Sequence, residues 1–322
     1  MDAQFKSLAI NLVRITEAAA IAAGRYVGKG QKIEGDGAAV DAMRKAFSSI
    51  EMKGVVIIGE GEKDEAPMLY NGEKVGNGKG LELDIAIDPV EGTNLLALGR
   101  PNAIAVVGAA PKGAMYNPGP SYYMQKLVVP KEAKDVVDID APVKENLKNV
   151  AKEIGKSVED LVVFVLDKPR HSKLISEIRE AGARIQLHTD GDVAGSLLAV
   201  DPCGDCDVMM GVGGTPEGVI SACAIKAIGG EMFSRLAPQS EEEKQSLIDY
   251  GIDLKEILSV DTLVKGSDVF FAATGISGGT FLSGIDYTNK GASSNSMVLN
   301  SRTGTVRHIK SFHQMDKINQ YT

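Results

Sequence analysis

The stretch LELDIAID, residues 81–88, alternates apolar and polar side chains and predicts a β-strand. Asp84 and Asp88 fall on one face of that strand, because successive side chains of a strand point to opposite faces. A carboxylate in such an apolar segment loses hydration, and this loss is costly unless a partner compensates it. The sequence therefore requires a partner for these carboxylates.

The residues that follow, PVEGT at 89–93, predict a tight turn. Pro89 is expected to end the strand, since proline cannot donate a hydrogen bond to a neighbouring strand. Gly92 permits the turn, which would bring the Glu91 carboxylate and the Thr93 hydroxyl toward Asp88. The simpler interpretation is that Asp88 and Thr93 are only turn-forming or helix-capping residues.

Other acidic residues occupy comparable positions. Glu60 follows a second predicted strand, and Asp36 and Glu217 lie near predicted helix starts. Hard cations such as Mg²⁺ or Mn²⁺ take several oxygen ligands from separate segments, so a divalent metal is the partner that we expect. Asp36 as a helix cap and Glu217 as a complement to a helix dipole are the competing interpretations.

The N-terminal part of the chain has an α+β pattern. Apolar residues recur at helical spacing over 5–24, and a second helix is expected from about 37 to 50. Strands are expected at GVVII, LELDIAID and NAIAVVGAAP, residues 54–58, 81–88 and 102–111. We therefore expect helices packed on a mostly antiparallel sheet.

From about residue 160 the pattern changes to three successive strand–helix units, which predict a parallel sheet covered by helices. The tail returns to antiparallel strands with a hairpin at residues 301–305. We therefore expect two lobes, an α+β lobe at 1–158 and an α/β lobe at 159–322.

The loops that leave the three parallel strands are DKPRH, TDGD and GVGGTPEG, residues 167–171, 189–192 and 211–218. Ligands of open α/β sheets bind outside the carboxyl ends of the strands. In an acidic chain, Lys168 and Arg170 at such a position favour phosphate binding over their usual place as solvated surface charges. Asp190 and Asp192 either form a turn around Gly191 or accept hydrogen bonds from sugar hydroxyls.

Composition excludes several classes of partner. The formal net charge of −8 over 322 residues argues against nucleic acid or an anionic membrane. The charge-free run AAAIAA at 18–23 is too short for a signal-peptide core or a membrane span. Three cysteines indicate a reducing compartment, so a cytoplasmic location is expected. Cys203 and Cys206 form a CxxC pair, but the rest of a zinc or redox pattern is missing.

A family resemblance rests on several of these segments together. IGEGE at 58–62 followed by IDPVEGT at 87–93 resembles the metal-binding signature of the lithium-sensitive sugar- and inositol-phosphatase superfamily. The segments GEGEKDEAPMLYNGEKVG, KPRHSKLI, DGDVAGSLL and GGTPEGVISA, in this order, resemble the class II fructose-1,6-bisphosphatases. The resemblance covers nearly the whole chain. It implies a two-lobed, layered α/β/α/β/α sugar-phosphatase fold, with a metal-binding catalytic lobe at 1–158 and a sugar-phosphate-binding lobe at 159–322.

The resemblance also implies roles for individual residues. The family's metal ligands fall on Asp36, Glu60, Asp88, Glu91 and Glu217. The family's substrate contacts fall on Glu91, Gly92, Thr93, Tyr123, Lys168, Pro169, Arg170, Asp190, Gly191, Asp192 and Gly214. Around NPGPSYYMQKL, residues 117–127, the chain is longer than the family pattern by a residue or two, so Tyr122 stays an alternative to Tyr123.

The activity that the resemblance implies is the Mg²⁺- or Mn²⁺-dependent hydrolysis of the 1-phosphate of fructose 1,6-bisphosphate, a step of gluconeogenesis. We recognise no Ser/His/Asp or Cys nucleophile constellation, which favours direct attack by a water that Thr93 orients. The alternatives are a sister specificity for sedoheptulose 1,7-bisphosphate or an inositol phosphate, and a non-catalytic metal- or sugar-phosphate-binding protein. The expected partner is a small-molecule sugar bisphosphate, the expected assembly is a homo-oligomer (a dimer or tetramer), and no nucleic-acid or membrane partner is expected.

Overall fold

The computed structural model describes residues 2–59, 69–202, 204–314 and 317. The chain divides into two compact units, which we call unit 1 (residues 1–115 and 266–322) and unit 2 (residues 116–265). This division differs from the expected lobes at 1–158 and 159–322, because strand pairing rather than sequence order groups the elements. Residues 123–129 pair with later strands of unit 2, whereas residues 270–275 pair back with unit 1.

Unit 1 contains helices α1 (Asp2–Gly24), α2 (Lys32–Ser48) and α3 (Thr93–Leu98). Its strands are β1 (Met52–Ile58), β2 (Lys74–Val75), β3 (Leu81–Glu91), β4 (Ile104–Pro111), β10 (Phe270–Gly275), β11 (Asp286–Thr288), β12 (Gly291–Asn300) and β13 (Thr305–Gln314). They form one sheet in the order β11-β12-β10-β4-β3-β1-β2, with β13 paired to β12. Among the described strand pairs of this sheet, β1–β3 is parallel and the others are antiparallel, so the mostly antiparallel sheet is confirmed.

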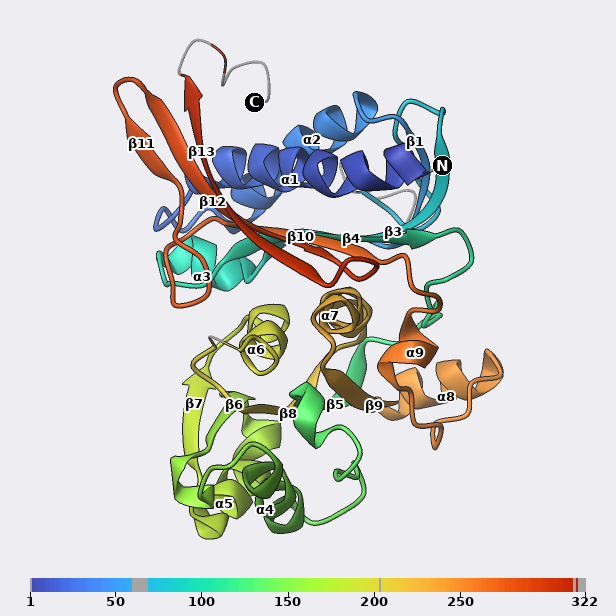
Figure 1. Cartoon of the computed structure of the whole chain (residues 1–322), viewed down its shortest axis with the longest axis vertical. Helices are drawn as coiled ribbons and strands as arrows, with labels where there is room; N and C mark the ends of the chain where they lie inside the picture. Colours follow the sequence, from blue (N-terminus) through green and yellow to red (C-terminus); the bar gives the residue numbers. More distant parts are fainter. Residues whose placement is uncertain (1, 60–68, 203, 315–316, 318–322) are drawn as a thin grey trace. The chain divides into compact units, whose positions relative to one another are not determined.

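Helices α1 and α2 cover one face of this sheet (Figure 1). Leu12, Ile15 and Ala19 of α1 are completely buried in the core that these helices form with the sheet. By length and composition alone, Ser7–Gly24 of α1 would be able to cross a membrane, but 72% of this segment is buried inside the protein. Its apolar composition is that of a helix in a protein core.

Helix α2 begins at Lys32, earlier than the expected start near residue 37. A glycine is needed at position 35 of this helix because two neighbouring side chains approach it closely. A Cβ atom at Gly35 would lie 2.6 Å from Leu96 Cδ2 and 3.0 Å from Tyr26 Cβ. Asp36 therefore lies inside α2 and does not cap it, which excludes the capping interpretation for this residue.

Unit 2 contains helices α4 (Val143–Glu153), α5 (Ser172–Ala181), α6 (Asp192–Leu198), α7 (Thr215–Ile228), α8 (Glu241–Asp249) and α9 (Val260–Leu263), and short 3₁₀ turns η1 (Lys131–Ala133), η2 (Val158–Asp160) and η3 (Pro169–His171). Its strands are β5 (Tyr123–Val129), β6 (Val162–Leu166), β7 (Arg184–His188), β8 (Val208–Gly214) and β9 (Glu231–Leu236).

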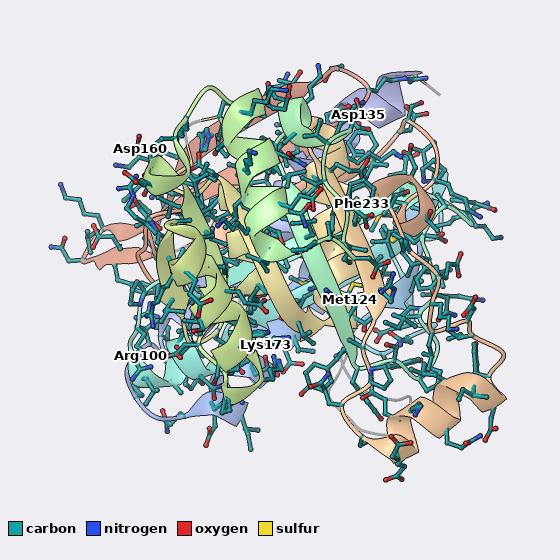
Figure 2. The ribbon with its side chains drawn as sticks, turned by 90° about the horizontal axis from the view of Figure 1, so that it is seen from below. Arg100, Met124, Asp135, Asp160, Lys173 and Phe233 are labelled. Atoms are coloured by element: carbon teal, nitrogen blue, oxygen red, sulfur yellow. The ribbon has the colours of Figure 1, made fainter. Side chains whose placement is uncertain are left out.

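The sheet of unit 2 has the order β7-β6-β8-β5-β9. The three strands β6, β7 and β8 are parallel, as the strand–helix units predict. The sheet also contains β5, which is antiparallel to both β8 and β9 and which the strand–helix units do not predict. Helices α4 and α5 cover one face of this sheet, and α6 and α7 cover the other (Figure 1). Figure 2 shows β5 beside β9, with Met124 and Phe233 on the two strands. The two helix-covered sheets confirm the mixed α/β fold class.

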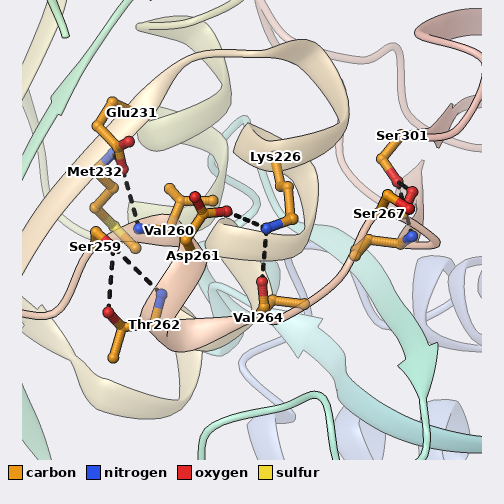
Figure 3. Close-up of polar contacts among 11 residues, drawn as sticks. Lys226, Glu231, Met232, Ser259, Val260, Asp261, Thr262, Val264, Ser267 and Ser301 are labelled. Carbon is orange, nitrogen blue, oxygen red and sulfur yellow. Dashed lines mark hydrogen bonds and ion pairs between the residues drawn. The ribbon is translucent and has the colours of Figure 1, made fainter.

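A set of hydrogen bonds fixes α9 within unit 2 (Figure 3). Lys226 of α7 donates hydrogen bonds to the Asp261 carboxylate and, at 2.8 Å, to the Val264 carbonyl. Ser259 Oγ accepts a hydrogen bond from the Thr262 N–H and caps α9. These contacts attach the segment after α8 to the C-terminal end of α7.

Candidate active site

Strand β3 continues through Pro89, so the prediction that this proline ends the strand was wrong. Asp88 lies opposite Val106 of β4, whereas Glu91 lies opposite Ile104, so three steps on β3 match two on β4. The extra residue forms a β-bulge, in which a proline without an N–H is tolerated. The Val90 N–H donates to Asp88 Oδ1 at 3.0 Å and closes the bulge.

The bulge decides which way Glu91 points. Without it, Glu91 would lie out of phase with Asp84 and Asp88; the extra residue restores the phase and puts all three carboxylates on one face. The alternate residues Leu83, Ile85 and Ile87 belong to the core formed with α1 and α2. Asp84 is held in place by the Met115 N–H, which donates to Oδ2 at 3.1 Å.

The turn after the bulge begins a short helix. Gly92 has φ +90°, and it occupies the N-cap position of α3, where a Cβ atom would lie 2.9 Å from Leu95 Cδ1. Thr93 is the first residue of α3, and its side chain does not cap the helix. The first turn of α2 lies against this helix, because Lys32 Nζ donates to Asn94 Oδ1 at 3.2 Å. Gly35, the residue before Asp36, also lies against α3, since a Cβ atom there would lie 2.6 Å from Leu96 Cδ2.

Unit 1 therefore holds Asp36, Asp88, Glu91 and Thr93, and unit 2 holds Glu217. Glu60 lies outside the described residues. Within the part of the chain that the structure describes, no group of three or more His, Cys, Asp or Glu side chains is arranged to hold a metal ion. The structure gives the positions of Asp36, Asp88 and Glu91 within unit 1 and of Glu217 within unit 2.

In unit 2 the parallel strands β6, β7 and β8 end at the same edge of the sheet, as their register requires. Their loops bring together the residues that the resemblance assigns to the substrate. Lys168, Pro169 and Arg170 follow β6, Asp190, Gly191 and Asp192 follow β7, Gly214 is the last residue of β8, and Glu217 follows it. Tyr123 reaches the same edge because β5 is antiparallel and Tyr123 lies opposite Gly214.

The loop after β6 is fixed to β8 by two adjacent side chains. The Arg170 guanidinium donates from Nε and Nη2 to the Val212 carbonyl, at 3.0 and 2.8 Å. The His171 ring is buried, with Nδ1 2.6 Å from the Leu166 carbonyl and Nε2 2.7 Å from the Val212 nitrogen. Because an N–H donates and a carbonyl accepts, Nδ1 carries the proton and Nε2 accepts. Burial, with the Arg170 and Lys168 charges adding to it, lowers the pKa of His171 and favours this neutral ring.

The structure distinguishes the two tyrosines at the start of β5. Arg170 lies over the ring of Tyr123, with its Cζ 5.2 Å from the ring centroid, while Tyr122 is 68% exposed. The backbone N–H groups of both residues donate to Oε1 of the buried Glu243. Glu243 was missed in the sequence, where it lies in an acidic run typical of an exposed helix start.

A buried cluster of charges lies beside the ends of β7 and β8. Lys126 Nζ donates to Asp192 Oδ2 at 2.6 Å, and both side chains are buried. Among the described residues, Asp192 Oδ1 and Glu217 Oε2 are buried and accept no hydrogen bond. Burial raises the pKa of Glu217 to about 7, the Asp192 carboxylate adds to this rise and Lys126 opposes it. Carboxylate oxygens in this state gain from a nearby cation, so Glu217 fits a metal ligand.

Gly214 is closely packed against Glu217, and two of the cysteines are buried. A Cβ atom at Gly214 would lie 1.7 Å from Glu217 Oε2, so a side chain there would displace that carboxylate. Burial raises the pKa of Cys206 and of Cys223 to about 12, which keeps both thiols protonated and unreactive. Cys203 lies outside the described residues.

Comparison with known proteins shows the family of this chain. The family described as "Bacterial fructose-1,6-bisphosphatase, glpX-encoded" matches residues 6–313. The fructose-1,6-bisphosphatase class 2 of Haemophilus influenzae is 42% identical over 326 residues, covering 97% of this chain and 98% of the relative. The fructose-1,6-bisphosphatase 1 class 2 of Escherichia coli K12 is 41% identical over 325 residues, covering 97% and 96%. The chain therefore belongs to the family of bacterial, glpX-encoded fructose-1,6-bisphosphatases.

Proposed function

We propose that this chain hydrolyses the 1-phosphate of fructose 1,6-bisphosphate to give fructose 6-phosphate and phosphate, in gluconeogenesis. The observation that carries the proposal is the single sheet edge of unit 2, where a cationic loop, a tyrosine and two aspartates are placed together in a member of this family. A bisphosphorylated sugar offers phosphate groups for the cations and hydroxyl groups for the carboxylates.

The family is metal-dependent, and we assign the metal to the oxygen ligands Asp36, Glu60, Asp88, Glu91 and Glu217. The common face of Asp88 and Glu91 on β3 and the buried oxygen of Glu217 support this assignment. When bound, Mg²⁺ or Mn²⁺ would neutralise phosphate charge and acidify a water molecule. All five proposed ligands offer carboxylate oxygens, the donors that these hard cations prefer.

The substrate contacts follow from unit 2 and from the turn after β3. Lys168 and Arg170 bind phosphate, and the Tyr123 ring supports the guanidinium. Asp190 and Asp192 accept hydrogen bonds from sugar hydroxyls, with Pro169, Gly191 and Gly214 contributing backbone contacts. Glu91, Gly92 and Thr93 contact the substrate from the turn after β3.

Thr93 is the catalytic residue in this proposal. Its hydroxyl is free of a capping role, because Gly92 occupies the N-cap of α3. It lies two residues after the proposed ligand Glu91, where it can orient a water for in-line attack on phosphorus. The high pKa of Cys206 and Cys223 supports attack by water rather than by a thiolate. We further propose a cytoplasmic location and a homo-oligomer, a dimer or tetramer.

The proposal is tested by phosphate release from a panel of substrates, each with Mg²⁺, with Mn²⁺ and with EDTA. We expect fructose 1,6-bisphosphate to be turned over with metal and not with EDTA, and fructose 6-phosphate to be left intact. Faster turnover of sedoheptulose 1,7-bisphosphate or of an inositol phosphate would assign a sister specificity. Tight binding of the bisphosphate without any phosphate release would instead assign a non-catalytic binding protein.

A further inference from the structure

Lys126 lies in the middle of strand β5, directly before the apolar residues LVV at 127–129, and is 1% exposed. Transfer of an ammonium group from water to a protein interior carries a large desolvation cost, so a buried lysine needs a charged partner. A lysine at this position is not needed for the sheet, because an apolar residue of similar length would fill the same space. The buried charge therefore needs a functional explanation.

The partner of Lys126 belongs to the candidate active site. The Nζ of Lys126 donates to Asp192 Oδ2 at 2.6 Å. The ammonium group thus compensates the charge of this buried carboxylate. Oδ2 of Asp192 is bound to Lys126, whereas the other oxygen, Oδ1, is buried and within the described residues has no hydrogen-bond partner.

The surrounding backbone is shaped around this pair of side chains. A Cβ atom at Gly213 of β8 would lie 1.8 Å from Asp192 Oδ2 and 3.4 Å from Lys126 Nζ. A Cβ atom at Gly218 of α7 would lie 3.1 Å from Lys126 Cε and 2.2 Å from Met124 Sδ. Strand β8 and helix α7 therefore each have a glycine where a larger residue would collide with Lys126, Asp192 or Met124. An incidental ion pair would not require this space.

We propose that Lys126 is a positioning residue for the hydrolysis of the sugar phosphate, which holds Asp192 so that its second oxygen faces the ligand. This proposal rests on the proposed function, in which Asp192 contacts the sugar. Lys126 itself touches neither substrate nor metal in this role. Its charge also compensates the buried Asp192 carboxylate in the folded state.

The test uses Lys126→Met, which keeps the length of the side chain and removes its charge. With Asp192 misplaced, we expect KM for fructose 1,6-bisphosphate to rise about 10- to 100-fold, the scale of one lost charge-assisted contact, with a smaller change in kcat. We also expect the melting temperature in EDTA to fall, because one carboxylate is left uncompensated. The matched control is Lys156→Met, which removes an equally short lysine–aspartate pair, to Asp207, from a more exposed position in unit 2. The control should leave KM at the parental value.

A double variant separates charge from packing. Lys126→Met with Asp192→Asn removes both charges, so we expect the melting temperature in EDTA to return toward the parental value while KM stays raised. Parental KM in folded Lys126→Met would overturn the positioning role. A double variant that melts as low as the single one would overturn charge compensation as its cause. The melting comparison does not depend on turnover, so an inactive parental enzyme would refute the proposed function separately.

Discussion

Replacing His171 with Phe tests how the phosphate-binding loop is held. The substitution keeps a buried ring and removes both ring hydrogen bonds. The Val212 N–H, which now donates to Nε2 at 2.7 Å, would lose its acceptor. The Leu166 carbonyl would keep the Lys168 N–H, which donates to it at 2.9 Å.

The expected loss of stability in His171→Phe follows from this difference between the Val212 N–H and the Leu166 carbonyl. An unsatisfied buried donor costs about 1–3 kcal/mol, and the lost Nδ1 hydrogen bond adds about 1 kcal/mol. The total of about 2–4 kcal/mol corresponds to a fall in melting temperature of roughly 4–16 °C for a unit of this size. Because Arg170 bonds to the carbonyl of the same Val212, its guanidinium should also move, and KM for the bisphosphate should rise by roughly tenfold, the scale of one weakened charge-assisted contact.

The assay compares melting temperature, KM and kcat for three variants. His171→Gln places an amide N–H and an amide oxygen near the positions of the two ring nitrogens, and it should recover part of both effects. His188→Phe is the matched control, because His188 stacks on Phe164 at 4.4 Å and its Nε2 makes a long, 3.4 Å contact with Gln186. Parental melting temperature and KM in His171→Phe would show that this ring neither stabilises the loop nor positions Arg170.

The other predictions concern pH, chemistry and metal. Because burial lowers the pKa of His171 below its usual 6.5, the unfolded chain binds the proton more tightly than the folded chain. The stability that this residue contributes should be complete above pH 6.5 and should be lost as the pH falls through the folded-state pKa. This pH dependence of the melting temperature should be absent in His171→Gln. Thr93→Val should lower kcat by roughly 100-fold with nearly parental KM and melting temperature, whereas Thr93→Ser should keep substantial activity. A fully active Thr93→Val enzyme would show that the Thr93 hydroxyl does not orient the attacking water. Glu91→Gln should lower activity by orders of magnitude and raise the Mn²⁺ concentration needed for half-maximal rate, and an unchanged metal titration would remove Glu91 from the ligand set.

Much of the fold could be predicted from local pattern. The alternation in LELDIAID predicts β3, and the strand–helix rhythm after residue 160 predicts the parallel strands β6, β7 and β8. The position of β5 could not be predicted in this way, because its neighbours β8 and β9 follow it by some 80 residues or more and no local signal encodes such pairing.

The candidate site was predictable to a different degree. The acids and the cationic loop stand out because charged residues are unusual at strand ends. The bulge at Pro89 was not predictable, because the sequence alone does not reveal that β4 has one residue fewer. Lys126 and His171 each bond to a residue far away in sequence, at a separation of 66 residues for Lys126 and Asp192 and of 41 residues for His171 and Val212. A lysine within an apolar strand was the one available signal.

The division of unit 1 between residues 1–115 and 266–322 has a consequence for protein synthesis. Strand β4 pairs with β10 along its length. This edge of β4 therefore stays unpaired until the ribosome has synthesised β10, roughly 160 residues later. At about 5–20 residues per second, this interval lasts roughly 8–30 s. During that time unit 2 emerges as a continuous segment and can fold first, while the nascent β4 presents an unpaired apolar edge of the kind that chaperones recognise. Unit 1 therefore begins to be synthesised before unit 2 and is completed after it.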